Sequence, residues 1–193
     1  MTDTKDGIRR AFSESVVAHQ RFVEDQIEAL NRVIHCVAET FRRGNKVLLF
    51  GNGGSAADAQ HIAAEFVNRF CRERPPLPAI ALTTDTSVLT SISNDFSYDV
   101  VFEKQVRALG CEGDLGVALS TSGNSPNVLA AVKACRAKGI MTVGLTGPGG
   151  GRLRGEVDHL LSVEFGKNTA RIQETHILIG HVICEMVDDV LFG

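Results

Sequence analysis

The stretch that decides the fold reads Val47-Leu48-Leu49-Phe50-Gly51-Asn52-Gly53-Gly54-Ser55, an apolar run that passes directly into a turn of glycine and small polar residues. A second stretch has the same plan and reads Gly116-Val117-Ala118-Leu119-Ser120-Thr121-Ser122-Gly123-Asn124-Ser125. Each stretch predicts a strand that ends in a turn and then opens a helix. Backbone N–H groups are free at a helix start, and together with hydroxyl donors they suit a phosphate monoester. We therefore expect a phosphorylated ligand at these two turns.

Neither turn matches the motifs that bind nucleotides. The lysine of a P-loop is missing from both, and so is the G-x-G-x-x-G spacing of a dinucleotide fold. This difference favours a small phosphorylated ligand over a nucleotide. The alternative is that both are ordinary connections between a strand and a helix, in which glycine and serine are common.

The composition predicts a soluble cytoplasmic protein of one domain, or of one domain with an appendage. The chain has 193 residues, 44% of them hydrophobic and 22% charged, which is an ordinary globular balance. Its formal charge is −3 and it has no basic stripe, which argues against direct binding of nucleic acid. It has no apolar leader and no apolar run of bilayer length, so we expect no membrane partner. Its five cysteines form no C-x-x-C pair, as expected for buried thiols in a reducing compartment.

One amphipathic stripe at helical spacing, mostly apolar, covers residues from about 8 to 43. It consists of Phe12, Val16, His19, Val23, Ile27, Leu30, Ile34, Val37 and Phe41. The spacing predicts one long amphipathic helix, or two, ended by Gly44-Asn45. A stripe of this length needs a second surface to cover it. Self-association through a helical bundle is one solution, and packing on the chain's own domain is the other.

After Gly44 the pattern alternates between strands and helices. The predicted strands are Lys46–Phe50, Ala79–Leu82, Gly116–Leu119, Met141–Leu145 and His159–Val163, and the predicted helices lie near 55–71, 86–94, 99–109, 125–138 and 169–191. This order predicts an α/β fold with a doubly wound parallel sheet of five strands. Ligands bind such sheets at the carboxyl ends of the strands, where both serine- and glycine-rich turns fall.

Two helices carry side chains capable of acid–base or metal chemistry. His61 and Glu65 are four residues apart and so share one helix face, as a metal pair, a base with its partner or a surface contact. The last helix carries Gln173 and His181. His181 lies among apolar residues, and a histidine in that setting is more often a packed core residue than a catalyst. Asn94-Asp95 reads by default as a polar helix end.

These residues together resemble the phosphoheptose isomerase family, the sedoheptulose 7-phosphate isomerases of the sugar-isomerase (SIS) domain superfamily. The resemblance runs from the N-terminal helices to the end of the chain. The Ser-Thr-Ser-Gly-Asn-Ser turn alone marks only the superfamily. The combination is more specific, and it comprises Phe50 to His61, Glu65, the turn at 120–125, Arg171-Ile172-Gln173-Glu174 and His181.

The resemblance implies a flavodoxin-like SIS domain over residues 45–193 and an N-terminal helical oligomerisation segment over 1–44. It implies a homotetramer with sites near subunit interfaces. It also implies that the substrate is bound by Asn52, Gly53, Gly54, Ser55, Glu65, Asn94, Asp95, Ser120, Thr121, Ser122, Ser125 and Gln173. One zinc ion per subunit would be held by His61, Glu65, Gln173 and His181.

The activity implied is isomerisation of D-sedoheptulose 7-phosphate to D-glycero-D-manno-heptose 7-phosphate, a precursor of heptose in bacterial lipopolysaccharide. Glu65 and His181 match the acid–base pair of the family, so Glu65 would take a carbon-bound proton and His181 would protonate oxygen. The reaction would pass through an enediol.

Two features complicate this resemblance. Many members have an acidic residue just before Arg171, where this chain has Ala170. The stretches at 74–82 and 104–110 resemble a paralogue that binds the replication initiator protein and keeps the fold. That paralogue lacks the Glu and the second His of the isomerase, whereas this chain keeps both as Glu65 and His181. The alternative is therefore an initiator-binding tetramer without essential catalysis.

Overall fold

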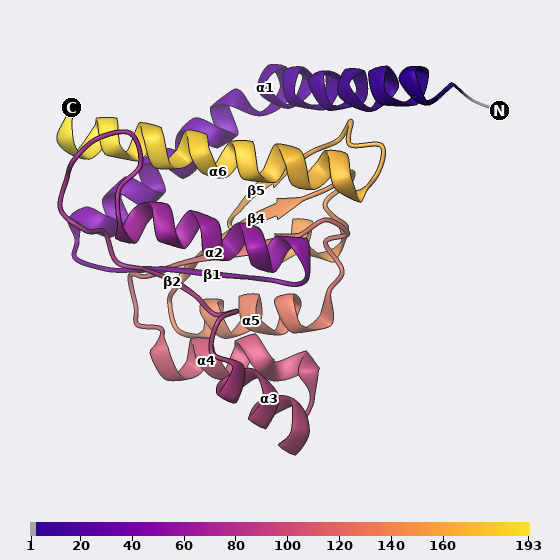
Figure 1. The fold of residues 1–193 in the computed structure, drawn as a ribbon. Coiled ribbons are helices and arrows are strands. Elements are labelled where there is room, and N and C mark those ends of the chain that lie inside the picture. The colour runs from indigo at the N-terminus through magenta and orange to yellow at the C-terminus, as the bar shows by residue number, and fades with distance from the viewer. Residues whose placement is uncertain (1–2) are drawn as a thin grey trace.

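The computed structural model describes residues 3–193 and has a sheet of five parallel strands at its centre (Figure 1). The strands lie in the order β2-β1-β3-β4-β5. Their bounds are β1 Val47–Gly51, β2 Ala79–Ala81, β3 Leu115–Ser120, β4 Met141–Thr146 and β5 His159–Ser162. The central strands β1 and β3 are buried along their whole length, as expected for strands covered on both faces. The predicted doubly wound α/β fold is confirmed.

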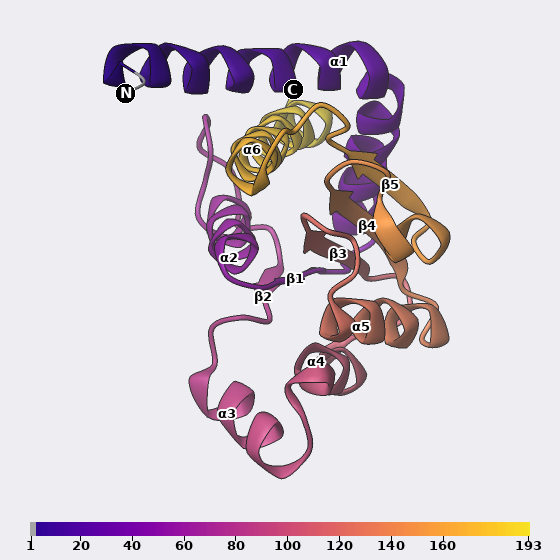
Figure 2. The same cartoon turned by 90° about the vertical axis from the view of Figure 1, so that its right-hand side faces the viewer.

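Helices cover both faces of the sheet (Figure 2). One face carries α1 Thr4–Arg42, α2 Gly54–Val67 and α6 Thr169–Phe192, which share a core with strand residues such as Leu49 and Leu145. The other face carries α4 Val101–Leu109 and α5 Pro126–Ala137, whose core includes Phe50 and Phe102. The rest are α3 Thr86–Asp95, which buries none of its residues, and the short 3-10 helices η1 Tyr98–Val100 and η2 Gly151–Gly155.

The direction of winding reverses between β1 and β3, which are neighbours in the sheet. β2 pairs with one side of β1 and β3 with the other, and Gly51 lies opposite Leu119 in the register. Ligands of open α/β sheets bind outside the carboxyl ends of the strands at such a reversal. Both serine- and glycine-rich turns begin at this point.

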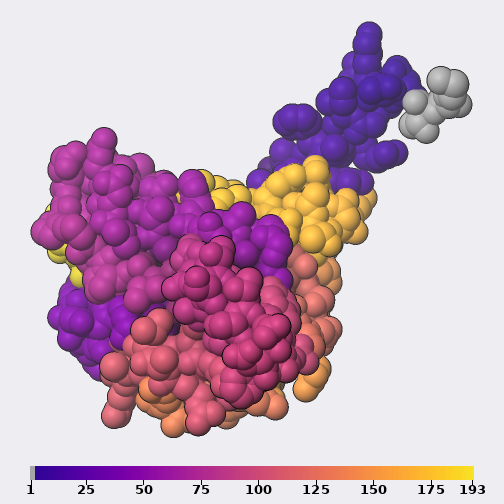
Figure 3. Space-filling view, turned by 60° about the horizontal axis from the view of Figure 1, so that its bottom comes forward, coloured from indigo at the N-terminus to yellow at the C-terminus, as the bar shows by residue number. Residues whose placement is uncertain are grey.

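The N-terminal stripe forms one continuous helix, α1. Asp3 caps its start by accepting a hydrogen bond from the N–H of Lys5, and Gly44 follows its end with a φ of 76°. The second half of α1, from Leu30 to Phe41, packs into the same core as the sheet. The first half projects from the body as an arm (Figure 3), and its exposed apolar residues are Ile8, Phe12, Val16, Val17, Val23 and Ile27.

Two helices differ from the sequence prediction. The helix predicted to end near residue 71 ends at Val67, because the Arg74 side chain binds the last carbonyl groups of α2, donating to Phe66 O at 2.6 Å and Asn68 O at 3.2 Å. The helix predicted over 99–109 is divided into η1 and α4, since Ser97 caps η1 by accepting from the N–H of Asp99. Among residues 3–193, the helices lack the combination of length and apolar character that crossing a membrane requires.

Candidate active site

The first turn connects β1 to the start of α2. Gly53 has a φ of 57°, a conformation that glycine adopts without strain. Gly51 is packed so closely that a Cβ atom there would lie 2.7 Å from the carbonyl oxygen of Leu119. Ser55 is buried in the first turn of α2, and its N–H donates to Asn52 O at 3.0 Å. The turn therefore points a helix start at the carboxyl edge of the sheet, as predicted.

The second turn connects β3 to the start of α5. Ser125 occupies the N-cap position and Pro126 follows it, a residue that suits the first turn of a helix because its missing N–H is not needed there. The Oγ atoms of Ser120 and Ser125 lie 3.0 Å apart. Ser122 Oγ accepts from the N–H of Asn124, and Thr121 O accepts from the N–H of Gly147 at 2.9 Å. The predicted serines thus surround a second helix start beside the first.

A pair of amide side chains joins the two turns. Asn52 Nδ2 donates to Asn127 Oδ1 and Asn127 Nδ2 donates to Asn52 Oδ1, both at 2.9 Å. The Tyr98 hydroxyl donates to the same Asn52 oxygen at 3.0 Å. Sequence reasoning missed Asn127 and Tyr98, because an asparagine near a helix start and a tyrosine just before a predicted helix carry no specific signal. The Asn52 side chain is thus engaged within the protein, where it fixes the two turns against each other.

The predicted pair Asn94 and Asp95 forms the end of α3. Asn94 Nδ2 donates to Asp95 Oδ1 at 2.9 Å, and both residues are exposed. The structure confirms that they lie at a polar helix end, and their contact with substrate stays a prediction.

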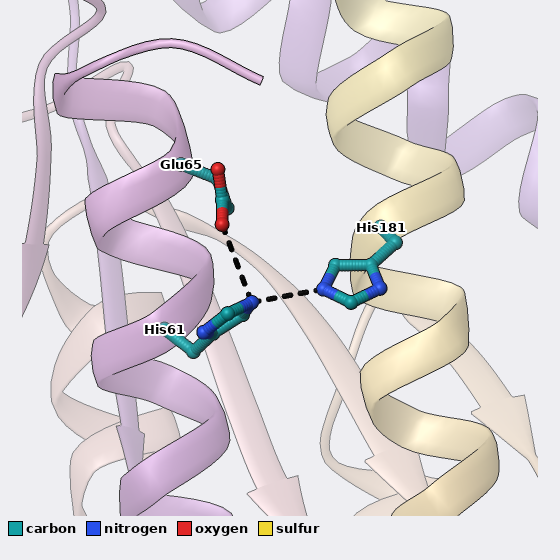
Figure 4. A group of neighbouring side chains, drawn as sticks. All are labelled: His61, Glu65 and His181. Carbon is teal, nitrogen blue, oxygen red and sulfur yellow. Dashed lines mark hydrogen bonds and ion pairs between the residues drawn. The ribbon is translucent and has the colours of Figure 1, made fainter. Parts of the chain in front are cut away.

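Three of the four predicted metal ligands come together between α2 and α6 (Figure 4). His61 Nε2 lies 2.9 Å from His181 Nε2 and 3.3 Å from Glu65 Oε1. Candidate ligand atoms of the three residues all lie within 4.8 Å of one another. The His181 ring also stacks on Phe70, with ring centroids 5.5 Å apart. His181 is therefore more than a packed core residue, since its Nε2 faces the two polar side chains of α2.

The fourth predicted ligand, Gln173, lies at the start of α6. Its amide packs against Gly54, where a Cβ atom would lie 2.7 Å from Gln173 Oε1. Gly54 precedes His61 by about 10 Å along α2, at 1.5 Å per residue. Gln173 thus lies beside the first turn, while His61, Glu65 and His181 form their own cluster. Its role as a ligand stays a prediction.

The cluster has the chemistry of a divalent metal site. Two imidazole nitrogens and one carboxylate are a common donor set for zinc, and three protein ligands leave a position open, as in catalytic sites. Nearby, burial raises the pKa of Asp58 to about 6, against the opposing effect of His61. Oδ2 of Asp58 is buried without a hydrogen-bond partner.

A second histidine of α6 has a structural role. His176 is fully buried, and its Nε2 lies 3.1 Å from the carbonyl oxygen of Thr146 at the end of β4. Burial lowers the pKa of His176 to about 4, so at neutral pH the ring is uncharged and Nε2–H donates to that carbonyl. This bond fixes α6 to the carboxyl end of the sheet.

Comparison with known proteins places this chain in a family. Residues 11–147 match the SIS domain family. A phosphoheptose isomerase of Thermodesulfovibrio yellowstonii is 48% identical over 98% of this chain and 94% of its own length. One from Nitratidesulfovibrio vulgaris is 62% identical over 81% of this chain and 74% of its own. The chain belongs to the phosphoheptose isomerase family of SIS domain proteins.

Solved structures of this phosphoheptose isomerase family have the same fold. A phosphoheptose isomerase from Neisseria gonorrhoeae superposes with a TM-score of 0.91 at 43% identity, covering 96% of this chain and 99% of that one. One from Francisella tularensis gives a TM-score of 0.93 at 38% identity, covering 98% of this chain and all of the other. The flavodoxin-like fold with its long N-terminal helix is therefore the fold of the family.

Proposed function

We propose that the protein is an aldose–ketose isomerase that converts D-sedoheptulose 7-phosphate to D-glycero-D-manno-heptose 7-phosphate. The observation that carries this proposal is the convergence of Glu65 and His181 from α2 and α6, since α2 begins at one of the two turns that carry hydroxyl groups and helix-start N–H groups. High identity to proteins named phosphoheptose isomerase supports it. The family's initiator-binding paralogue lacks the acid–base pair, so its function is not favoured for this chain.

The reaction moves one proton between adjacent carbons and others between oxygens. Glu65 takes the proton from C1 of the ketose while His181 gives a proton to the oxygen on C2, and the product of this step is an enediol. The C1 hydroxyl then loses its proton and C2 gains one, which yields the aldose. A carboxylate and an imidazole supply both functions near neutral pH.

The phosphate binds at the starts of α2 and α5. Ser55, Ser120, Ser122 and Ser125 would donate hydroxyl groups to it, together with backbone N–H groups at the starts of the two helices. This binding holds C1 and C2 in place for the acid–base pair. The amide pair of Asn52 and Asn127 keeps the two helix starts at a fixed separation.

We propose one zinc ion per subunit, held by His61, Glu65 and His181, with Gln173 as the predicted fourth ligand. The donor chemistry of the cluster fits zinc. Bound there, zinc would polarise the carbonyl and hydroxyl oxygens of the substrate.

We also propose that the active form is a cytoplasmic homotetramer. The apolar residues on the arm of α1, such as Phe12 at 72% exposure, need cover. The arm continues into an apolar groove between α1 and α6, which is lined by residues including Ile27, Ile34, Val182 and Met186. A second copy of the chain presents a matching stripe, so bundling of the arms would cover both.

The proposal is tested by assaying purified protein with sedoheptulose 7-phosphate and, in parallel, with unphosphorylated sedoheptulose. We expect heptose 7-phosphate to form from the first substrate, and the second to be converted far more slowly. Equal conversion of both sugars would contradict the phosphate site. If neither sugar were converted, the proposal that the protein is an isomerase would be contradicted.

A further inference from the structure

A buried ion pair joins α6 to the connection that follows α2, and these two helices carry the His-Glu-His cluster. Arg74 Nε lies 2.9 Å from Asp188 Oδ1, and the two side chains are only 1% and 3% exposed. Asp188 belongs to α6, and Arg74 belongs to the connection that follows α2. Replacing a buried ion pair by apolar residues is often neutral for stability, so its presence here asks for another explanation.

Arg74 also binds the end of α2 directly. Its guanidinium donates to the carbonyl oxygens of Glu65 at 2.8 Å and Phe66 at 2.6 Å. These are among the last carbonyls of the helix, which have no partner within it. Arg74 therefore holds the backbone of the residue whose side chain we propose as the base.

The same pair fixes α6 relative to α2. Asp188 follows His181 by about two helical turns. The two helices approach closely next to His61 and His181. Gly180 of α6 packs there against Ile62 of α2, and a Cβ atom on Gly180 would lie 2.7 Å from Ile62 Cγ1. This contact limits how far apart the helices lie. An apolar contact alone does not fix how one helix is shifted along, or rotated against, the other. The bonds of Arg74 to Asp188 and to the carbonyl groups of α2 are directional, so they constrain the register in a way that apolar contact does not.

We propose that Arg74 and Asp188 are positioning residues that align Glu65 on α2 with His181 on α6. This inference rests on the proposed function, because the aligned groups are the proposed acid–base pair and metal ligands. It assigns Arg74 no contact with substrate or metal. Arg74 acts on Glu65 by holding the backbone at the end of α2 in place.

The chain offers a matched control for this pair. Asp114 is also a buried carboxylate in an ion pair, with Lys46 Nζ at 2.6 Å from its Oδ2 and the N–H of Lys46 at 3.0 Å from its Oδ1. It lies at the amino end of β3, at the opposite edge of the sheet from the two turns. Loss of either carboxylate unpairs a buried or half-buried cation, but only Asp188 connects the cluster helices.

The test compares Asp188→Asn and Arg74→Lys with Asp114→Asn. Zinc affinity is measured by competition with a chromophoric chelator, the visible spectrum is recorded with cobalt(II), and thermal unfolding is followed without metal. We expect Asp188→Asn and Arg74→Lys to weaken zinc binding at least about tenfold, which is the usual effect of replacing residues that orient metal ligands without binding the metal. Both variants should also alter the cobalt spectrum. Asp114→Asn should lower thermal stability and leave affinity and spectrum unchanged. Equal effects of Asp188→Asn and Asp114→Asn on zinc affinity would overturn the proposal.

A double variant separates positioning from stability. Combining Arg74→Met with Asp188→Leu removes both charges and should restore thermal stability toward the wild-type value. We expect zinc affinity to stay low, because the bonds to the end of α2 are gone. Recovery of affinity together with stability would show that the pair is only structural.

Failure of the metal assignment is distinguishable from failure of this inference. If wild-type protein binds no zinc, the metal part of the proposed function is wrong. The positioning role is then judged by crystal structures of wild type and Asp188→Asn. Separation of His61 from His181 in the variant would support it, and an unchanged arrangement would overturn it.

Discussion

The role of each polar side chain at the site depends on which of its atoms are already bonded. Both the nitrogen and the oxygen of the Asn52 amide are hydrogen-bonded to Asn127, so Asn52 stabilises the turn. His61 lies between Glu65 and His181 and contacts both through one nitrogen, Nε2. A single ring nitrogen cannot donate to both at once, so this geometry suits a shared proton or a bound cation.

Replacing Glu65 by Gln should lower kcat at least about a hundredfold and keep the fold, because it removes a proton acceptor and hardly changes the shape of the side chain. Steady-state assay and circular dichroism check both parts. Glu73→Gln is the matched control, since Glu73 is an exposed glutamate in an i,i+4 ion pair with Arg69. Near-normal turnover of Glu65→Gln would rule out Glu65 as the base.

His176 should make the stability of the protein fall in mildly acidic solution. Its pKa is lowered to about 4 in the folded protein, whereas the ordinary value is 6.5, so the unfolded chain binds the proton more strongly. The free energy of unfolding should therefore drop as pH falls from 6.5 to 4, by about 3 kcal/mol from this group. Urea unfolding across this range, compared between wild type and His176→Gln, measures the effect. An identical pH dependence in both would contradict it.

At the scale of elements, the site is made by two strand-to-helix turns and two parallel helices. The turns converge because β1 and β3 are neighbours where the winding reverses. Helices α2 and α6 lie side by side on one face, with their N-terminal ends meeting at Gly54 and Gln173. Substrate phosphate and reacting carbons would thus be held by different parts of the same elements.

The serines of the second turn should contribute to substrate binding more than to stability. Ser125 occupies an N-cap position without forming a side-chain cap, and its Oγ faces Ser120 instead. We expect Ser120→Ala and Ser125→Ala each to reduce kcat/KM about tenfold, near the value of one hydrogen bond to a charged group. Kinetic assay measures this, and thermal unfolding should show only small changes. Full activity in both variants would remove the second turn from the phosphate site.

The elements were largely predictable from the sequence, and the side-chain contacts were not. Short apolar runs predicted all five strands, because buried parallel strands are continuous in apolar residues. The end of α2 was predicted too late, since the cap comes from Arg74 beyond the helix. His61 and His181 lie 120 residues apart, and no spacing rule connects them, so only family resemblance predicted their meeting.

At the scale of the whole molecule, the two halves of α1 differ: the second half packs in the core of the domain, and the first half exposes apolar side chains. The second half of α1 belongs to the core that it shares with the sheet. The predicted boundary between an N-terminal segment and the SIS domain, at residue 44, therefore falls after residues that already pack on the sheet. Arg171 Nη1 donates to Ala11 O at 2.5 Å, which links the arm to the start of α6. In the proposed tetramer, a subunit packed on the arm would therefore be linked to the helix that carries Gln173 and His181.

Charge introduced on the arm should dissociate the assembly. Phe12→Asp together with Ile27→Asp places carboxylates on the exposed apolar stripe, and these would be buried in a helical bundle at high cost. We expect light scattering to show a tetramer for wild type and smaller species for the variant. Leu109→Asp, at an exposed apolar residue of α4, is the control. A tetrameric variant would exclude the arms as the interface.

The most direct test of the central claim is proton NMR of sedoheptulose 7-phosphate with the enzyme in D2O. Isomerisation through an enediol forms the aldose and brings a solvent deuteron to its C2, provided that the acid–base groups exchange with solvent. We predict heptose 7-phosphate that carries deuterium at C2 with wild type, and with Glu65→Gln both product formation and exchange slowed at least about a hundredfold. Failure of wild type to form the aldose, or formation of the aldose by Glu65→Gln as fast as by wild type, would contradict the account.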